Sequence, residues 1–185
     1  LSALIMPTGT FFFVDTYVSA DPSVEELAEM TILAAAELRR FGVEPRVALL
    51  SHSNFGTRDT PSALKMRAAR ERIVALNPDF EIDGEMNADA AVSEEIRERT
   101  FPDSLLTGQA NLLVFPNLDS ANIAFNLMKQ LGDGLAVGPV LLGTARPVHI
   151  LTPSVTARGI LNMTAVAAVG AQQRLKSQTL DAAGA

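Results

Sequence analysis

The sequence predicts an α/β protein of three layers, in which helices cover both faces of a mostly parallel sheet. Two short apolar runs, 46–51 (RVALLS) and 111–115 (NLLVF), have the composition of strands that are covered on both faces. Such runs alternate with longer segments in which apolar residues recur at helical spacing. Strands that are joined by helices usually pair in parallel, so this alternation indicates the class.

Seven strands are expected, and each is a short apolar run bounded by turn or loop residues. In chain order they are 2–6, 11–17, 46–51, 80–84, 111–115, 137–142 and 148–151. The segment 7–10 (PTGT) separates the first two and is typical of a tight turn. Residues 1–20 should therefore form an N-terminal strand pair.

Five helices are expected between and after these strands, at 24–41, 61–76, 88–99, 120–131 and 156–174. Ser23 and Glu26 have the spacing of a capping box at the start of the first helix, and Gly42 can end that helix. Pro61 can open the second helix, which the pair Asn77-Pro78 should stop.

The elements divide the chain into an α/β subdomain over 21–153, a C-terminal helix over 154–176 and a flexible tail over 177–185. The last helix is rich in Ala, Val and Met on more than one side. A helix that is apolar on several sides is normally buried, so we expect it to pack against a part of the protein that lies outside this chain. Since the sequence begins with Leu1, it looks cut from a longer polypeptide.

Composition excludes several classes of function. A net charge of −6 with scattered basic residues lacks the electrostatic footprint of a nucleic-acid partner. No apolar run approaches the roughly 20 residues that a membrane span needs. There is no Cys, and His52 and His149 lie far apart, so we expect no thiolate metal site and no cysteine nucleophile. Lack of Cys suits a cytoplasmic protein, which is the location we expect.

Loops that follow buried strands are the first candidates for a binding site, because ligands of open parallel sheets lie beyond the carboxyl ends of strands. The loop after 46–51 offers hydroxyl groups, an amide and backbone N–H groups that could hold a phosphate or carboxylate. Its candidate ligand-binding residues are Ser51, His52, Ser53, Asn54, Gly56 and Thr57. Composition favours the simpler interpretation that the loop only shapes the turn and caps the next helix.

Two further loops hold polar residues after predicted strands. Asn117 and Asp119 follow the strand 111–115 and are also candidate ligand-binding residues, although capping of the next helix by Asp119 or Ser120 is the favoured interpretation. His149 lies within an apolar segment, so a hydrogen-bonded structural histidine is favoured over a proton shuttle. None of these loops carries a visible nucleophile with a partner base.

Five segments in fixed order resemble the C-terminal half of phosphate acetyltransferases. They are 21–30 (DPSVEELAEM), 47–56 (VALLSHSNFG), 110–122 (ANLLVFPNLDSAN), 137–148 (VGPVLLGTARPV) and 160–172. A closer resemblance is carried by the segments RVALLSHSNFG, DGEMNADAA, PDSLLTG and HILTP. Through them the chain resembles still more closely the phosphotransacetylase-like C-terminal domain of bacterial NADP-dependent malic enzymes. The resemblance implies the C-terminal portion of a two-subdomain phosphotransacetylase-like fold, whose last helix returns to the first subdomain.

The resemblance also implies that acetyl transfer is lost. Active phosphotransacetylases carry a Ser-Arg pair and a following Asp, and the matching positions here are Thr152, Pro153 and Gly159. Pro has no charge to offer an anionic substrate, and Gly has no side chain that could accept the proton of a thiol. We therefore expect no catalytic residue in this chain, while Thr152 and Arg158 remain candidate ligand-binding residues.

What the resemblance implies for function is a regulatory and oligomerisation domain of an NADP-dependent malic enzyme, with acetyl-CoA or another CoA ester as the inhibitory signal. The partners would be the catalytic domain in the same chain and further copies of the protein. NADP and a divalent metal would bind only in that catalytic domain. An active phosphate acetyltransferase and a purely structural oligomerisation module remain alternatives.

Overall fold

The computed structural model describes residues 1–151, 153 and 155–183, with side chains up to Leu175. The strands are β1 (Ser2–Met6), β2 (Gly9–Val14), β3 (Arg46–Leu50), β4 (Glu81–Met86), β5 (Leu112–Val114) and β6 (Leu135–Val137). The helices are α1 (Val24–Arg40), α2 (Pro61–Ala75), α3 (Ala88–Val92), α4 (Glu94–Thr100), α5 (Leu118–Leu131) and α6 (Ala157–Ala183).

The strands form one mixed sheet in the order β4-β3-β5-β2-β1-β6. The four strands β2, β3, β4 and β5 are parallel, and Leu113 of β5 lies in register with both Phe13 of β2 and Ala48 of β3. The strand β1 is antiparallel to both of its neighbours, β2 and β6. The sheet is therefore mostly parallel, as the sequence predicts.

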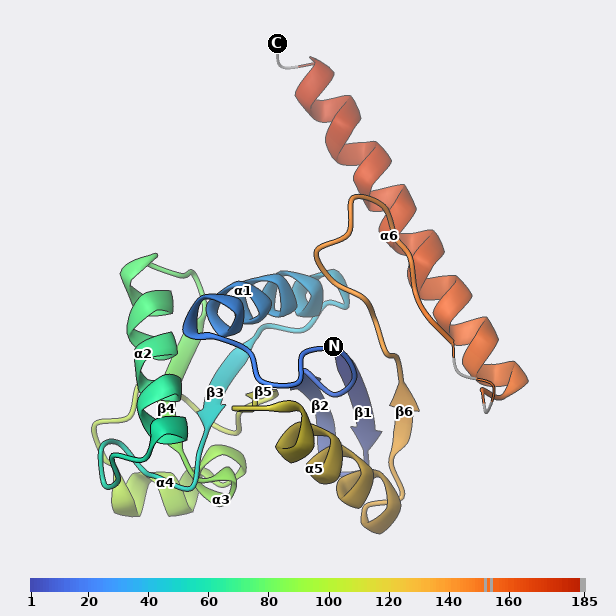
Figure 1. Cartoon of the computed structure of the whole chain (residues 1–185). Coiled ribbons are helices and arrows are strands. Elements are labelled where there is room, and N and C mark those ends of the chain that lie inside the picture. Colours follow the sequence, from blue (N-terminus) through green and yellow to red (C-terminus); the bar gives the residue numbers. More distant parts are fainter. Residues whose placement is uncertain (152, 154, 184–185) are drawn as a thin grey trace.

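Helices cover both faces of this sheet, which gives three layers (Figure 1). Alternate residues of the strands lie in two hydrophobic cores, one on each face of the sheet. Phe12, Val47 and Leu49 face α1 and α2, whereas Phe13 and Ala48 face α3 and α5. Strands that are buried on both faces have continuous apolar sequences. This explains the composition of 46–51 and 111–115.

Local signals set the ends of the first two helices. The Ser23 side chain accepts a hydrogen bond from the Glu26 backbone N–H at 3.2 Å, and the Glu26 carboxylate accepts one from the Ser23 N–H at 2.7 Å. This reciprocal pair is the predicted capping box. Thr60 caps α2, with Pro61 as its first helical residue.

Three predicted elements differ from the structure. The helix expected over 88–99 is broken at Ser93, whose extended backbone ends α3 and whose hydroxyl caps α4 by accepting from the Ile96 N–H at 3.3 Å. A serine favours such a cap because its side chain can satisfy the free N–H groups of a new helix.

The strands expected at 137–142 and 148–151 are wrong. The structure has one short strand, β6, which ends at Val137. Pro139 and Pro147 lack the N–H that a strand needs for its ladder, and Gly138 adopts a positive φ of 127°. The chain from 138 to 151 therefore runs as an irregular segment.

The last helix is longer than expected, because α6 continues to Ala183 and so includes residues 177–183 of the segment expected to be a flexible tail. Residues 177–183 contain neither Gly nor Pro, so nothing in the sequence stops the helix there. Met163 is buried and Val166 packs on the core that contains α1. Figure 1 shows α6 extending beyond the sheet. Ile160, Leu161 and Val169 of this helix are exposed. Among the described residues, no helix combines the length and apolar character needed to cross a membrane.

Candidate functional site

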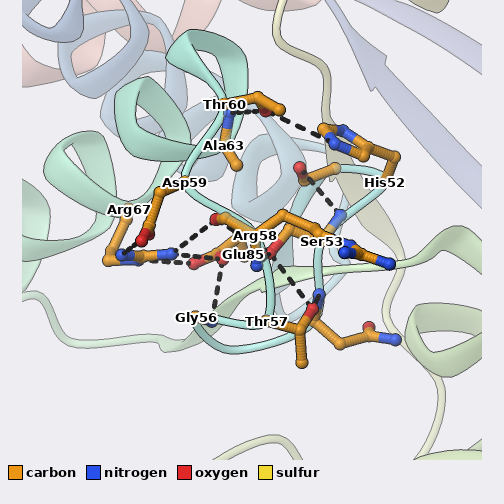
Figure 2. A network of polar contacts seen from close by, with 12 residues as sticks. His52, Ser53, Gly56, Thr57, Arg58, Asp59, Thr60, Ala63, Arg67 and Glu85 are labelled. Atoms are coloured by element: carbon orange, nitrogen blue, oxygen red, sulfur yellow. Dashed lines mark hydrogen bonds and ion pairs between the residues drawn. The ribbon is translucent and has the colours of Figure 1, made fainter.

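The loop at 51–57 follows the carboxyl end of β3, the position that makes it a candidate site. Its centre is the carboxylate of Glu85, which enters from the neighbouring strand β4 (Figure 2). The Ser53 hydroxyl donates to Glu85 Oε1 at 2.8 Å, and the Gly56 N–H donates to the same oxygen at 2.9 Å. The loop therefore folds around a carboxylate that belongs to the protein itself.

Glu85 is 1% exposed and carries its charge because of a second set of donors. Arg67 of α2 donates to it twice, from Nη2 to Oε1 at 3.0 Å and from Nε to Oε2 at 3.2 Å. Burial alone raises the pKa of Glu85, but the hydrogen bonds from Arg67, Gly56 and Ser53 outweigh burial and hold that pKa below its usual value. Arg67 also pairs with the exposed Asp59 at 3.2 Å.

The other candidate residues of the loop bond mainly to each other. The Asn54 N–H donates to Thr57 Oγ1 at 3.0 Å, and the Ser53 N–H donates to Ser51 Oγ at 3.1 Å. His52 Nε2 lies 3.3 Å from the hydroxyl of Thr60, the cap of α2. These contacts fix the turn and the start of α2, as the simpler interpretation of the loop expects.

An internal carboxylate thus takes the place that an external anion would occupy. The donors of Ser53 and Gly56 point at Glu85, so an outside phosphate or carboxylate would have to displace a paired, buried charge to reach them. The ligand-binding role of the loop residues stays a prediction. Sequence reasoning missed Glu85, whose only signal was its place among acidic residues in the strand 81–86 (EIDGEM).

Asn117 and Asp119 lie at the carboxyl end of β5, where α5 begins. Asn117 is the N-cap, since its side-chain oxygen accepts from the Ser120 N–H at 2.9 Å. Asp119 stands exposed in the first turn, where a negative charge is favourable. Capping by Asn117 rather than by Asp119 explains this loop.

Of the three positions where the resemblance places catalytic groups, Thr152 lies outside the described residues. Pro153 is exposed, and Gly159 lies in the first turn of α6, where its N–H donates to Thr156 Oγ1 at 3.1 Å. A Cβ at Gly159 would lie 2.7 Å from Val155 Cγ2, so this turn has no room for a side chain as it stands. Arg158 is exposed beside it.

The structure does not bring these two groups of candidates together. Figure 1 places the start of α6 and the loop between β3 and α2 on opposite sides of the molecule. Of four cavities formed by the described residues, none is lined by residues from both groups. In the same part of the chain, no group of three or more His, Asp or Glu side chains could hold a metal ion.

A cavity of about 290 Å³ lies instead between α1, the segment 140–149 and α6. Its polar side chains are Glu37 and Arg40 from α1, Thr144 and His149 from the segment 140–149, and Arg174 from α6. His149 Nδ1 accepts from the Leu141 N–H at 3.3 Å, which is the hydrogen-bonded structural role that the sequence favours. Burial lowers the pKa of His149, although the nearby Glu37 carboxylate raises it. Sequence reasoning missed Glu37, Arg40 and Arg174.

The comparisons with known proteins agree on one family. Residues 1–168 match the model of the phosphate acetyl/butaryl transferase family. An NAD-dependent malic enzyme of Rhizobium meliloti is 59% identical over 169 residues, which cover 91% of this chain and 22% of that protein. An NADP-dependent malic enzyme of Escherichia coli is 54% identical over 173 residues, covering 93% and 23%.

Phosphate acetyltransferases match over a larger share of their own length. The enzyme of Paracoccus denitrificans is 41% identical over 162 residues, which are 87% of this chain and 51% of that protein. The crystal structure of a phosphotransacetylase from Streptococcus pyogenes superposes with a TM-score of 0.87 at 35% identity and covers 93% of this chain and 54% of that one. The chain thus spans about a fifth of these malic enzymes and about half of these phosphate acetyltransferases. By sequence and by fold, the chain belongs to the phosphate acetyl/butaryl transferase family.

Proposed function

We propose that this chain is the regulatory and oligomerisation domain of a malic enzyme, that it binds acetyl-CoA as an inhibitory signal, and that it lacks acetyltransferase activity. The observation that carries the proposal is the pattern of identity. Malic enzymes match at 54% and 59%, against 41% for the phosphate acetyltransferase of Paracoccus denitrificans. The parent protein would carry out the oxidative decarboxylation of malate in a separate domain.

Loss of acetyl transfer is supported by what stands at the positions where the family resemblance places catalytic groups. Pro153 has no charge with which to hold an anionic substrate, and Gly159 has no side chain to accept a proton. Arg158, the neighbouring cation, is exposed at the start of α6. A domain that kept a binding cavity without these groups could still respond to a CoA ester.

The coenzyme of the parent remains a prediction. The sequence resemblance pointed to NADP, but the malic enzyme of Rhizobium meliloti is named as NAD-dependent and that of Escherichia coli as NADP-dependent. Initial rates of malate decarboxylation with each coenzyme would decide between the two.

Titration of the complete natural polypeptide with acetyl-CoA tests the proposal. Isothermal titration calorimetry should detect binding, and acetyl-CoA should lower the rate of malate decarboxylation. Formation of acetyl-CoA from acetyl phosphate and coenzyme A should be undetectable in the same preparation. Lack of both binding and inhibition would remove the sensing role, whereas brisk acetyl-CoA formation would establish the alternative of an active phosphate acetyltransferase.

A purely structural oligomerisation module is the second candidate, and exposed apolar side chains favour it. Ile160, Leu161 and Val169 of α6 are exposed, as are Ile123 and Leu127 of α5. Exposed apolar surface of this kind marks association surfaces. Light scattering of the complete polypeptide with and without this segment would test the module, which an unchanged oligomeric state would rule out.

A further inference from the structure

The cavity between α1, the segment 140–149 and α6 is lined by more donors than its own residues use. Arg40 is half-exposed and donates from Nη1 to Glu37 at 2.9 Å. Arg174 donates from Nη1 to the carbonyl oxygen of Ala145. A guanidinium has five N–H donors, so most donors of both side chains are not engaged by the interactions of the described residues.

His149 adds a neutral hydrogen-bond donor to the lining of the cavity. Because His149 Nδ1 accepts from the Leu141 N–H, the proton of the neutral ring lies on Nε2. Burial lowers the pKa of the ring and so favours its neutral form. With two arginines against the one carboxylate of Glu37, the lining carries a net positive charge within a protein whose net charge is −6.

Apolar side chains from three elements complete the lining. Leu33 comes from α1, Leu142 from the irregular segment, and Val166 from α6, where it also packs on the core. The volume of about 290 Å³ is at the small end of the range for ligand pockets. An anionic group attached to a short, uncharged arm matches both the charge and the apolar walls.

We propose that this cavity is an anion-binding site in which Arg40 and Arg174 hold a phosphate group of the CoA ester. The proposal rests on the sensing function proposed above and names the site for it. Arg–phosphate contacts are charge-assisted and are frequently bidentate, so one phosphate can engage both guanidinium groups. Glu37 then limits how readily the site binds an anion, because the anion must compete with the Glu37 carboxylate for Arg40.

The site also offers a route for the signal. Arg40 belongs to α1, which packs on the sheet, whereas Arg174 belongs to the part of α6 beyond Met163 and Val166, the residues that dock it. A phosphate held by both arginines ties α6 to α1. Occupancy would therefore fix the direction in which α6 leaves the domain, and amide hydrogen exchange around Arg174 should slow when acetyl-CoA binds.

Calorimetric titration of the complete natural polypeptide with acetyl-CoA tests the site, using Arg40→Gln and Arg174→Gln. Each substitution should raise the Kd for acetyl-CoA about tenfold or more, as expected for loss of a hydrogen bond to a charged group. Arg99→Gln is the matched control, since Arg99 is an exposed arginine on α4, across the sheet from α1. Its Kd should equal that of the wild type.

A further variant keeps the test of the site decisive if the arginine variants do not fold. Ala36 lines the cavity and is exposed, so Ala36→Leu fills space without removing a charge and should weaken binding in the same way. Thermal melts followed by circular dichroism identify which variants are folded. If the arginine variants do not fold, the Ala36→Leu titration decides the question.

The outcomes separate this site from the sensing function itself. If the wild type binds acetyl-CoA and every folded cavity variant binds equally well, the site is overturned while sensing stands. If the wild type does not bind acetyl-CoA, the proposed sensing function is overturned. Titration with inorganic phosphate and acetyl phosphate then tests whether the cavity binds anions. Binding of either anion that Arg174→Gln weakens supports an anion site, and binding of neither overturns it.

Discussion

Arg67 and Glu85 form a two-point ion pair, with Nη2–Oε1 at 3.0 Å and Nε–Oε2 at 3.2 Å, beneath the loop that follows β3. The pair joins the helix after the loop to the strand beside it, and Ser53 and Gly56 complete the shell of the carboxylate. A loop with the composition of an anion site therefore satisfies its donors internally, and its first role is to hold β3, β4 and α2 in position.

Replacement of Glu85 by Gln should lower the free energy of unfolding by about 2 kcal/mol. Breaking a buried ion pair typically costs about 3–5 kcal/mol, but Arg67 is 29% exposed and keeps Asp59 as a partner. Urea denaturation measures the change. Asp59→Asn is the control on the same arginine, and since Asp59 is 77% exposed its loss should stay below about 1 kcal/mol. Equal effects of the two substitutions would contradict the assignment of Glu85 as the structural partner.

The same carboxylate should make the protein sensitive to acid. The pKa of Glu85 lies below its usual value of 4.5, so ionised Glu85 stabilises the fold above that pH, and this contribution is lost as the pH falls through the lowered pKa. The difference in stability between wild type and Glu85→Gln should therefore be largest near pH 7 and shrink below about pH 4.5. Urea midpoints from neutral to acid pH measure it, with Glu29→Gln on the exposed face of α1 as a control. A difference that stays constant over the range would exclude this linkage.

Short-range signals in the sequence were sufficient for most elements. The capping box of Ser23 and Glu26 and the pair Thr60-Pro61 lie within single helical turns, and the structure confirms the helices that they open. The break at Ser93 was missed because the apolar pattern of 88–99 continues through it, although serine was a possible cap. The irregular segment 138–151 was misread because its apolar composition outweighed its prolines.

The polar sites could not be predicted, because they depend on contacts between distant parts of the chain. Glu85 meets Ser53 across 32 positions and Arg67 across 18. The cavity that contains Arg40 and Arg174 is lined by residues of α1, the irregular segment and α6, which lie far apart in the sequence. Neither arrangement has a periodicity or spacing that a single sequence displays, whereas the strand ends that carry the loops could be located.

The core beneath β2 and α5 should depend strongly on Phe13. This side chain is fully buried, with its ring centroid 5.8 Å from that of Phe115 and 5.3 Å from that of Phe125. Phe13→Ala should cost about 3–5 kcal/mol, because it removes apolar burial and leaves a cavity. Phe41→Ala is the control: Phe41 is 38% exposed and stacks on Phe12 at 6.0 Å, so its loss should be clearly smaller. Denaturant midpoints that fall equally for both would contradict this ranking.

Gly84 should be the least replaceable glycine of the sheet. Its φ is +134°, and a Cβ would lie 2.6 Å from the carbonyl oxygen of Leu49 in the neighbouring strand β3. Because that oxygen belongs to the backbone of a central strand, it cannot move aside as a flexible side chain would. Gly84→Ala should therefore lower the free energy of unfolding by at least about 3 kcal/mol, through strain and overpacking together.

Gly108→Ala separates these two causes. Gly108 has a positive φ of +68°, but a Cβ there would meet nothing within 4 Å. Its replacement should cost about 1 kcal/mol from backbone strain alone. Urea denaturation of both variants measures the difference, which we assign to the close approach between β3 and β4. If Gly84→Ala were no more destabilising than Gly108→Ala, the two strands would have room to separate, and the position of Glu85 next to Gly84 would not be fixed by their packing.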